Sequence, residues 1–329
     1  MYPFSNLAIV GAGIAGIACA TKLQEAGLKV RLFEKSGGVS GRMSTRRGNG
    51  WQCDHGAQYF TARHPDFRAE VARWQRAGVA GLWNPRPQVF GDLSLHAPDQ
   101  ALERFVGTPT MTAPARLLSS ALPLTFHATI QQLQRQPDGW QLLSAEDGAL
   151  VERFDAVVLA IPAPQAAPLL QPLSAELAEL ARSATMGGCW TVMARFATPP
   201  ELPFDAAFVN EGPLRWIARD TSKPDRRGPE TWVLHASVDW SEANLEQDAD
   251  TVAAALLKAF GRLGAPAPQA WSVHRWRYAT VIEPVLDRSC AWHADLGLGL
   301  CGDWLNGGKV EGAWLSGRQL ALRILESSR

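Results

Sequence analysis

The sequence predicts an α/β fold in which a doubly wound parallel sheet is interleaved with an α+β domain built on an antiparallel sheet. Three observations favour this fold. The amino terminus has the pattern of a strand, a glycine turn, a helix and a second strand, and the carboxyl terminus has a strand, glycines and a helix. Between them lies a region of short strands rich in Trp and Arg. The outer segments predict one parallel sheet, so the middle region forms a domain inserted into it.

Composition indicates a globular protein with a small-molecule partner. The chain has 329 residues, of which 46% are hydrophobic, and its 32 basic residues balance its 32 acidic ones. This balance gives no reason to expect nucleic acid or a membrane surface as partner. The apolar run Leu7–Ala20 is interrupted by glycines and is too short for a membrane anchor or signal peptide. The cysteines form no C-x-x-C pair, which argues against disulfides and zinc and indicates a reducing cytoplasm. They are Cys19, Cys53, Cys189, Cys290 and Cys301.

The first unit has the pattern of a dinucleotide-binding βαβ motif. Strands are expected at Leu7–Val10 and Val30–Phe33, with an apolar helix between them. Glu34 closes the second strand, where its carboxylate can accept both hydroxyls of a ribose. A tight turn packed for its own sake would not explain this acid. The intervening glycines Gly11, Gly13 and Gly16 follow the G-x-G-x-x-G spacing. In this motif the first glycine allows a tight turn, the second allows close approach of a pyrophosphate, and the third allows the helix to pack on the strand.

A second glycine-rich loop, Gly37–Arg47, favours FAD over NAD. It carries Arg42, placed to meet the same pyrophosphate from the opposite side, and simple NAD-binding units rarely need such a loop. The alternative is that Arg42, Arg46 and Arg47 form a solvated basic loop.

The middle of the chain predicts further elements of both domains. A helix is expected at Ala113–Ala121, a β-hairpin from Phe126–Gln134 and Trp140–Ser144, and a buried strand at Phe154–Pro162. From about residue 165 to residue 293, short strands alternate around one helix at Asp248–Arg262. This pattern indicates an antiparallel sheet with one face over a cavity.

The carboxyl-terminal stretch LCGDWLNGGKVEGAWLSG predicts that the chain returns to the first sheet. A last strand ends at Gly302–Asp303, and a helix begins near Gly308–Glu311, so its positive end points into the crevice at the sheet edge. A reduced flavin carries negative charge at N1/O2, so we expect the flavin ring near Val310–Ala313 and the pyrophosphate and ribitol near Asp303. The alternative is a solvent-exposed turn with glycine caps.

The predicted FAD-binding domain is therefore made of three segments and the substrate domain of two. The first comprises residues 1–60, 112–165 and 296–329, and the second comprises residues 61–111 and 166–295.

Four motifs, IVGAGIAG…FEK, GGVSGRM, FDAVVLAIP and CGDW…GGKVEGA, together resemble the flavin-containing amine oxidase superfamily. Within it, DHGAQYFTARHPDF (Asp54–Phe67) and HRWRYA (His274–Ala279) resemble the bacterial branch of the renalase family. The resemblance implies a two-domain fold like that of p-hydroxybenzoate hydroxylase, with noncovalent FAD. It also implies oxidation of 2- or 6-dihydro-NAD(P), isomers of NAD(P)H, to NAD(P)+ by hydride transfer to flavin, with oxygen reduced to hydrogen peroxide.

The sequence departs from ordinary amine oxidases in two ways. A GGCW stretch like that of flavin-linking oxidases occurs at Gly187–Trp190, more than a hundred residues before Gly302, so Cys189 is expected in the core or cavity and not as a flavin tether. No lysine falls in an obvious substrate-domain position to order a water at flavin N5.

The residues expected to contact FAD come from all these motifs. They are Gly11, Ala12, Gly13, Ala15, Gly16, Glu34, Lys35, Gly41, Arg42, Met43, Gly56, Ala57, Gln58, Ile130, Ala160, Gly302, Asp303, Val310, Glu311 and Ala313.

Oxidation of a dihydronicotinamide removes one hydride and leaves an aromatic ring, so no side chain is assigned as acid or base and flavin N5 is the hydride acceptor. The site needs a flat slot that holds the ring at about 3–3.5 Å from N5. Trp276 offers a further wall, and His55 is expected to be a core histidine. The residues expected to bind the substrate are Gln58, Tyr59, Phe60, Arg63, His64, His96, Trp216, His235, Arg277 and Tyr278.

Two other functions remain open from sequence. One is a flavin amine or polyamine oxidase, which would need an acidic or aromatic cage for an amine. The other is a flavin-binding protein without redox turnover.

Overall fold

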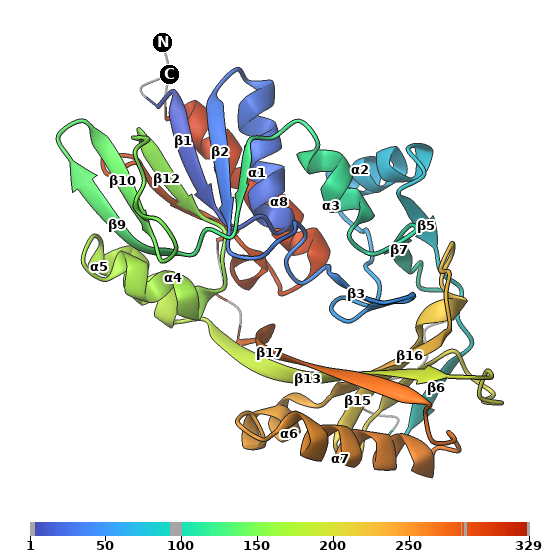
Figure 1. Cartoon of the computed structure of the whole chain (residues 1–329). Coiled ribbons are helices and arrows are strands. Elements are labelled where there is room, and N and C mark those ends of the chain that lie inside the picture. Colours follow the sequence, from blue (N-terminus) through green and yellow to red (C-terminus); the bar gives the residue numbers. More distant parts are fainter. Residues whose placement is uncertain (1–3, 93–100, 284, 286–287, 328–329) are drawn as a thin grey trace.

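The structure is a computed structural model of the chain, and it describes residues 4–92, 101–283, 285 and 288–327. It confirms the mixed α/β fold. A mainly parallel sheet lies at one end of the molecule and a long antiparallel sheet lies at the other, with loops and short helices between them (Figure 1).

The first sheet has the strand order β18-β19-β12-β1-β2-β8, and all of its pairings except β18 with β19 are parallel. The chain order changes direction on either side of β1, so a crevice forms between β1 and β12 at the carboxyl ends of the strands. The strands are β1 (Asn6–Val10), β2 (Lys29–Glu34), β8 (Leu124–Phe126), β12 (Ala156–Leu159), β18 (Ala291–His293) and β19 (Leu298–Leu300).

Alternating residues of β1 face two different cores. Leu7 and Ile9 pack on the face covered by α1 and α8, and Ala8 packs on the face covered by the β9-β10-β11 sheet and by α4 and α5. The helices α1 and α8 cross closely, because a side chain at Gly317 would lie 2.0 Å from the Ala15 carbonyl. These elements are α1 (Ile14–Glu25), α8 (Val310–Glu326), β9 (Ile130–Gln136), β10 (Gly139–Ser144), β11 (Gly148–Ala149), α4 (Ala163–Leu170) and α5 (Ala175–Arg182).

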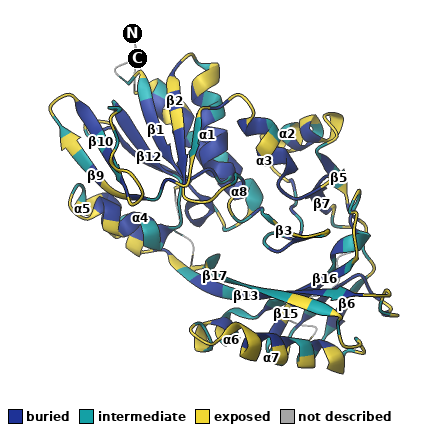
Figure 2. Ribbon diagram, in the orientation of Figure 1, coloured by how far each residue is buried: buried dark blue, intermediate teal, exposed yellow. Residues whose placement is uncertain are grey.

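The second sheet has the order β17-β13-β16-β15-β14-β6, and only β6 runs parallel to its neighbour. Helices α6 and α7 cover its outer face, where Val252 and Leu256 join the core, while the opposite side of α7 is exposed (Figure 2). The inner face of the second sheet is directed toward the first sheet (Figure 1). The elements are β6 (Pro87–Phe90), β13 (Thr185–Phe196), β14 (Ala206–Val209), β15 (Leu214–Arg219), β16 (Glu230–Ala236), β17 (Ala270–Glu283), α6 (Val238–Ala243) and α7 (Ala249–Arg262).

The segment between residues 61 and 111 divides its contacts between the two parts. Its strand β6 extends the second sheet, but Phe67, Trp74 and Phe105 belong to the same core as β1 and α1. The domain boundaries therefore stay a prediction. The other elements here are α2 (Pro65–Arg76), β5 (Ala80–Leu82), β7 (Phe105–Gly107) and the following α3 (Ala113–Ser119).

Most predicted elements are confirmed, including the helices now seen as α3 and α7. The prediction of one helix between residues 165 and 293 is wrong, because α5 and α6 also lie there. The strand predicted from Phe126 to Gln134 is wrong, because two strands occupy it. His127 adopts a positive φ of 55° and breaks the run, so β8 pairs with β2 while β9 forms the hairpin with β10. The strand predicted at Phe154–Pro162 is limited to β12, and Pro162 instead caps α4.

Candidate active site

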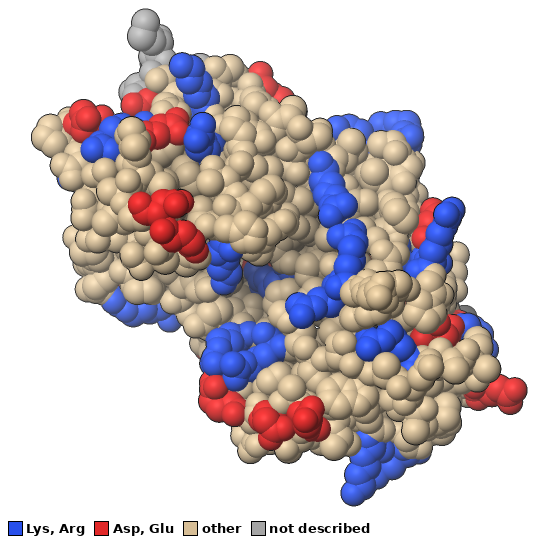
Figure 3. Space-filling model, in the orientation of Figure 1, with Lys and Arg blue, Asp and Glu red and all other residues tan. Residues whose placement is uncertain are grey.

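A cavity of about 1810 Å³ lies between the two sheets. The loops that follow β1, β2, β12 and β19 line one side of it, and residues of β13, β16 and β17 line the other. Figure 3 shows a hollow at this place, with Lys and Arg side chains around it. A crevice at the carboxyl ends of parallel strands is where this kind of sheet binds its ligands.

The turn between β1 and α1 is shaped to approach an anion. Gly11 has a φ of +103°, and a side chain there would lie 2.5 Å from the Ala160 carbonyl. A side chain at Gly13, in contrast, would meet nothing within 4 Å, so it would enter the cavity. The amino terminus of α1 has no side-chain cap and no acid in its first turn, which leaves N–H groups available to a phosphate.

Two of the residues expected to contact FAD do not line this cavity. A side chain at Gly16 would lie 2.1 Å from the Gly11 carbonyl, so this glycine permits close packing within the turn. The Ala12 N–H donates to Glu34 Oε2 at 2.9 Å and so fixes that carboxylate.

Glu34 is held rigidly at the end of β2. It is 8% exposed, and Oε1 accepts from the N–H and hydroxyl of Ser36 at 2.9 and 2.8 Å. Both lone pairs of Oε1 are therefore in use, whereas Oε2 accepts only the Ala12 N–H and retains one lone pair for a ligand. The position is suited to a hydrogen bond from one of the ribose hydroxyls predicted for it.

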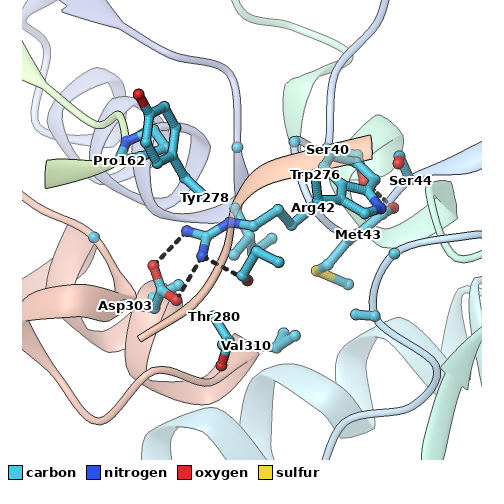
Figure 4. A pocket seen from close by; sticks show the side chains of 18 of the residues that line it. Ser40, Arg42, Met43, Ser44, Pro162, Trp276, Tyr278, Thr280, Asp303 and Val310 are labelled. Atoms are coloured by element: carbon cyan, nitrogen blue, oxygen red, sulfur yellow. Dashed lines mark hydrogen bonds and ion pairs between the residues drawn. The ribbon is translucent and has the colours of Figure 1, made fainter. Parts of the chain in front are cut away.

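Arg42 and Asp303 connect the second glycine loop to the end of β19. The guanidinium donates to Asp303 Oδ2 at 3.0 Å and to Oδ1 at 2.5 Å, and also to the Ala279 carbonyl at 3.3 Å (Figure 4). Asp303 begins the short helix η2 (Asp303–Leu305) and is only 6% exposed. Because Arg42 neutralises this carboxylate, Asp303 does not repel a phosphate bound beside it.

The amino terminus of α8 also points into the cavity. Its cap residue, Lys309, makes no side-chain capping bond, and Lys309 and Val310 both line the cavity. The Glu311 carboxylate is occupied elsewhere, since its Oε1 accepts the N–H groups of Arg63 and His64 at 2.7 and 2.6 Å. Glu311 thus fastens the segment before α2 to the start of α8.

Aromatic rings form the opposite wall. The His55 ring stacks on Trp276 with a centroid distance of 5.0 Å and meets His274 edge-on at 4.7 Å. The His55 carbonyl accepts hydrogen bonds from His235 Nε2 and Trp276 Nε1, both at 3.1 Å. All four residues line the cavity. His55 and His274 were not expected there, and only their position as the first residues of the HGAQ and HRWR motifs could have indicated it.

These histidines are neutral at physiological pH. Burial lowers the pKa of His55 to about 3, with His274 and Arg46 contributing, and lowers the pKa values of His235 and His274 to about 4. Two ring nitrogens in this wall, His55 Nδ1 and Trp216 Nε1, are buried without a partner among the described residues. The polar edge of a bound ring would satisfy them.

A buried cluster of charges lies behind the wall. Lys223, whose side chain is fully buried, donates to Asp220 Oδ1 at 2.9 Å, to Gln58 Oε1 at 3.1 Å and to Asp54 Oδ2 at 3.3 Å. Arg226 also bonds to Asp54. Burial alone would raise the pKa of Asp54, but Lys223 and Arg226 hold it at about 2.

Gln58 lines the cavity, yet its amide is used inside the protein. Its Nε2 donates to the carbonyls of Asp54 and Gly56, so the side chain holds the loop at residues 54–58. Lys223, which donates a hydrogen bond to Gln58 in this loop, was not predicted from sequence. The only sequence signal for it is DTSKPDRR, in which Asp220 and Lys223 place opposite charges three residues apart.

The other expected substrate residues have mixed placements. Arg277 lines the cavity but pairs with Glu246 through two contacts of 2.6 and 3.1 Å. His64 does not line it, because its Nδ1 caps α2 by accepting the Asp66 N–H at 3.2 Å. His96 lies outside the described residues. Those that line the cavity as expected are Tyr59, Phe60, Arg63, Trp216, His235 and Tyr278.

The remaining expected FAD contacts also line the cavity. They are Ala15, Lys35, Gly41, Met43, Gly56, Ala57, Ile130, Ala160, Gly302 and Ala313. Cys189 lines it as well, and burial raises the pKa of its thiol to about 12, so the thiol is not poised to bond to a flavin.

The described part of the chain holds neither a group of three metal-ligating side chains nor a helix long and apolar enough to cross a membrane.

Comparison with known proteins identifies related sequences. Residues 9–74 match the profile of the NAD(P)-binding Rossmann-like domain, and residues 77–325 match that of flavin containing amine oxidoreductase. The tRNA 5-methylaminomethyl-2-thiouridine biosynthesis bifunctional protein MnmC of Magnetococcus marinus is 33% identical over 217 residues, 52% of this chain and 31% of that protein. Protoporphyrinogen oxidase 2 of Arabidopsis thaliana is 42% identical over 61 residues, 18% of this chain and 12% of that protein. The matched stretches thus span less than a third of either relative.

Solved structures share the fold over nearly the whole chain. A putative protoporphyrinogen oxidase from Exiguobacterium sp. 255-15 superposes with a TM-score of 0.78 at 16% identity, covering 98% of this chain and 99% of that chain. Cyclohexylamine oxidase from Brevibacterium oxydans gives 0.74 at 14% identity, with the same coverage. At these identities the likeness shows the fold alone.

The residues present fit FAD held without a covalent bond. The open space at Gly13 and the uncapped amino terminus of α1 suit its diphosphate. The fixed carboxylate of Glu34 suits its ribose, and the uncapped amino terminus of α8 suits its flavin ring.

Proposed function

The chain belongs to the flavin containing amine oxidoreductase family, and on this premise we propose that it oxidises 2- or 6-dihydro-NAD(P) isomers to NAD(P)+, as the renalase-like motifs indicate. FAD, when bound, supplies a two-electron acceptor that takes the hydride and passes both electrons to oxygen, giving hydrogen peroxide with the hydride's proton and one from solvent.

The charge of the cavity carries this proposal. Among the described residues that line it, three of the four carboxylates are already engaged: Glu34 by Ala12 and Ser36, Asp303 by Arg42, and Glu311 by backbone N–H groups. Arg42, Arg275 and Arg277 are also paired with carboxylates. Even without these three, the cationic residues outnumber the carboxylates, which favours an anionic dinucleotide over a protonated amine. The cationic residues are Lys35, Arg42, Arg47, Arg63, Arg116, Arg215, Arg275, Arg277 and Lys309.

The neutral wall supports the same reaction. A histidine with a pKa of about 3 or 4 is a weak proton acceptor at neutral pH, so His55, His235 and His274 are poorly suited to deprotonate an amine. Hydride loss from a dihydronicotinamide needs no base. The rings of His55 and Trp276 provide a flat surface against which such a ring can stack, and their orientation determines which ring carbon is presented.

The test is anaerobic mixing of the FAD-loaded protein with borohydride-treated NAD+, which contains the dihydro isomers, while the flavin absorbance is recorded. We expect rapid bleaching by the isomers, slow or no bleaching by ordinary 4-dihydro-NADH, and peroxide release on admission of oxygen. Misplacement of a reacting carbon by about 1 Å can cost about a hundredfold in rate, which accounts for the expected selectivity. Bleaching by NADH as fast as by the isomers would overturn the proposal.

A flavin amine oxidase is the second candidate. Asp239, in the first turn of α6, is an exposed cavity-lining carboxylate without a partner among the described residues, and it could anchor an ammonium group. Bleaching by a primary amine that is lost in Asp239→Asn, with the dihydro isomers inert, would establish this alternative.

A further inference from the structure

Two arginines that line the cavity have no role in the site described above. Arg47 lies in β3 (Thr45–Gly48), and Arg116 lies in α3. Both line the cavity and are exposed, and within the described part of the chain neither side chain makes an ion pair or a hydrogen bond. Two exposed cationic groups in the cavity are thus left available to a ligand.

Arg47 and Arg116 lie on segments that are both hydrogen-bonded to Asp54, through Thr45 and through the N–H of Met111. Burial lowers the pKa of Arg47, and the charge of Arg116 lowers it further, with Asp54 acting weakly in the opposite direction. Asp54 cannot serve as the missing counter-ion, because Lys223 and Arg226 already bind it. A pair of like charges kept together without a carboxylate is relieved by an anion that both can contact.

The scaffold holds this pair in place. Asp54 Oδ1 accepts a hydrogen bond of 2.6 Å from Thr45, in the strand of Arg47, and one of 3.1 Å from the N–H of Met111, just before the helix of Arg116. Asp54 is fully buried and ends β4 (Trp51–Asp54), which pairs with β3. One rigid carboxylate therefore sets the strand and the helix relative to each other.

None of the residues expected to contact FAD lies in β3 or α3, although β3 begins two residues after Met43. The predicted diphosphate contacts come from the β1–α1 turn and from the Arg42 and Asp303 pair, and the ribose contact comes from Glu34. The β3–β4 hairpin instead leads directly into His55, which is part of the ring wall. The pair is therefore left available to the substrate.

We propose that Arg47 and Arg116 form a phosphate subsite that binds the substrate dinucleotide while its nicotinamide ring lies against the His55 and Trp276 wall. This rests on the proposed function. The phosphate bound is either the diphosphate bridge, shared by both dinucleotides, or the 2′-phosphate of the NADP forms.

The kinetic test compares Arg47→Ala, Arg116→Ala and the double variant with wild type in anaerobic flavin reduction. Since both side chains are exposed, we expect each single change to raise the concentration for half-maximal rate about fivefold, and the double change about 20-fold or more. The saturating rate should not change. Dihydronicotinamide riboside, which lacks phosphate, should react equally with all forms. Arg262→Ala, on the outer helix α7, is the matched control.

Comparison of NAD and NADP isomers identifies the phosphate. An equal effect on both indicates the diphosphate bridge, whereas an effect on the NADP isomers alone indicates the 2′-phosphate. If the variants lose affinity for the riboside as strongly as for the dinucleotides, the subsite does not recognise phosphate and the proposal fails.

Binding of inorganic pyrophosphate to the FAD-loaded protein, measured by calorimetry, tests the subsite without any turnover. We expect binding that weakens with salt and is lost in the double variant. This result would stand even if wild type oxidised no dihydronicotinamide, in which case only the proposed function would fail. Unchanged pyrophosphate binding in the double variant, or loss of FAD from it on dialysis, would refute the subsite.

Discussion

Replacement of Lys223 by Met tests the charge cluster behind the ring wall. In wild type, the carboxylates of Asp54 and Asp220 are balanced by Lys223 and Arg226, and the four side chains are at most 2% exposed. Met removes one charge and leaves hydrogen-bond acceptors on Asp220, Gln58 and Asp54 without their donor at 2.9 to 3.3 Å. Arg226 approaches Asp220 only to 4.0 Å, so it compensates poorly.

An uncompensated buried charge of this kind costs about 3–5 kcal/mol of unfolding free energy. We expect a loss of that size at pH 8 in urea unfolding followed by circular dichroism with FAD in excess. Lys258→Met, at an exposed position of α7, is the control and should change stability by less than about 0.5 kcal/mol.

The loss should depend on pH. Burial raises the pKa of Asp220 above its ordinary value, and removal of Lys223 raises it further. The folded variant then binds a proton that the unfolded chain releases, so its stability falls as pH rises from the unfolded pKa to the folded pKa. Measured at pH 5, the deficit should be smaller than at pH 8, and Asp220→Asn added to Lys223→Met should recover part of it. A cost below about 1 kcal/mol at pH 8, or one independent of pH and of the second change, would refute this reasoning.

Other predictions follow from the site. The purified protein should be yellow and should release FAD on acid precipitation, whereas flavin remaining in the pellet would contradict noncovalent binding. Glu34→Ala should weaken FAD retention by about 1.5–3 kcal/mol, measured as occupancy after dialysis, with Glu152→Ala as the surface control. Gly13→Val should weaken it more, because the added side chain enters the space meant for the diphosphate. The low pKa values of His55, His235 and His274 predict a rate of flavin reduction that is constant from pH 5.5 to 8, and an inflection of that rate near pH 6.5 would contradict this. The same pKa values predict that these histidines contribute stability above pH 6.5 and that this contribution is lost as pH falls toward 3–4.

The nucleotide-binding part could be predicted from sequence because its signals are local. The glycines of the first turn, Glu34 and the GD motif before α8 each lie within a single strand–turn–helix unit, and their spacing is set by the geometry of that unit. The hairpin boundary was misplaced because the positive φ of His127 is a backbone event that apolar periodicity does not report.

The ring wall and the charge cluster could not be predicted in the same way, because their contacts join distant segments. Asp54 meets Met111 across 57 positions and Lys223 across 169, and His55 meets Trp276 across 221. Only the fold brings these residues together. His64 illustrates the converse: the preceding residue, Arg63, lines the cavity, yet the ring of His64 caps α2.

The overall charge of the chain was equally uninformative about its partner. The 32 basic and 32 acidic residues cancel in sum, but the fold distributes them unequally. Most cavity-lining carboxylates are used internally, while the exposed side chains of Arg47 and Arg116 line the cavity. A ligand responds to the local field, which low-dielectric walls concentrate, and not to the net charge. A neutral chain can therefore present a strongly cationic site, and the prediction of an anionic dinucleotide rests on which carboxylates are already bound.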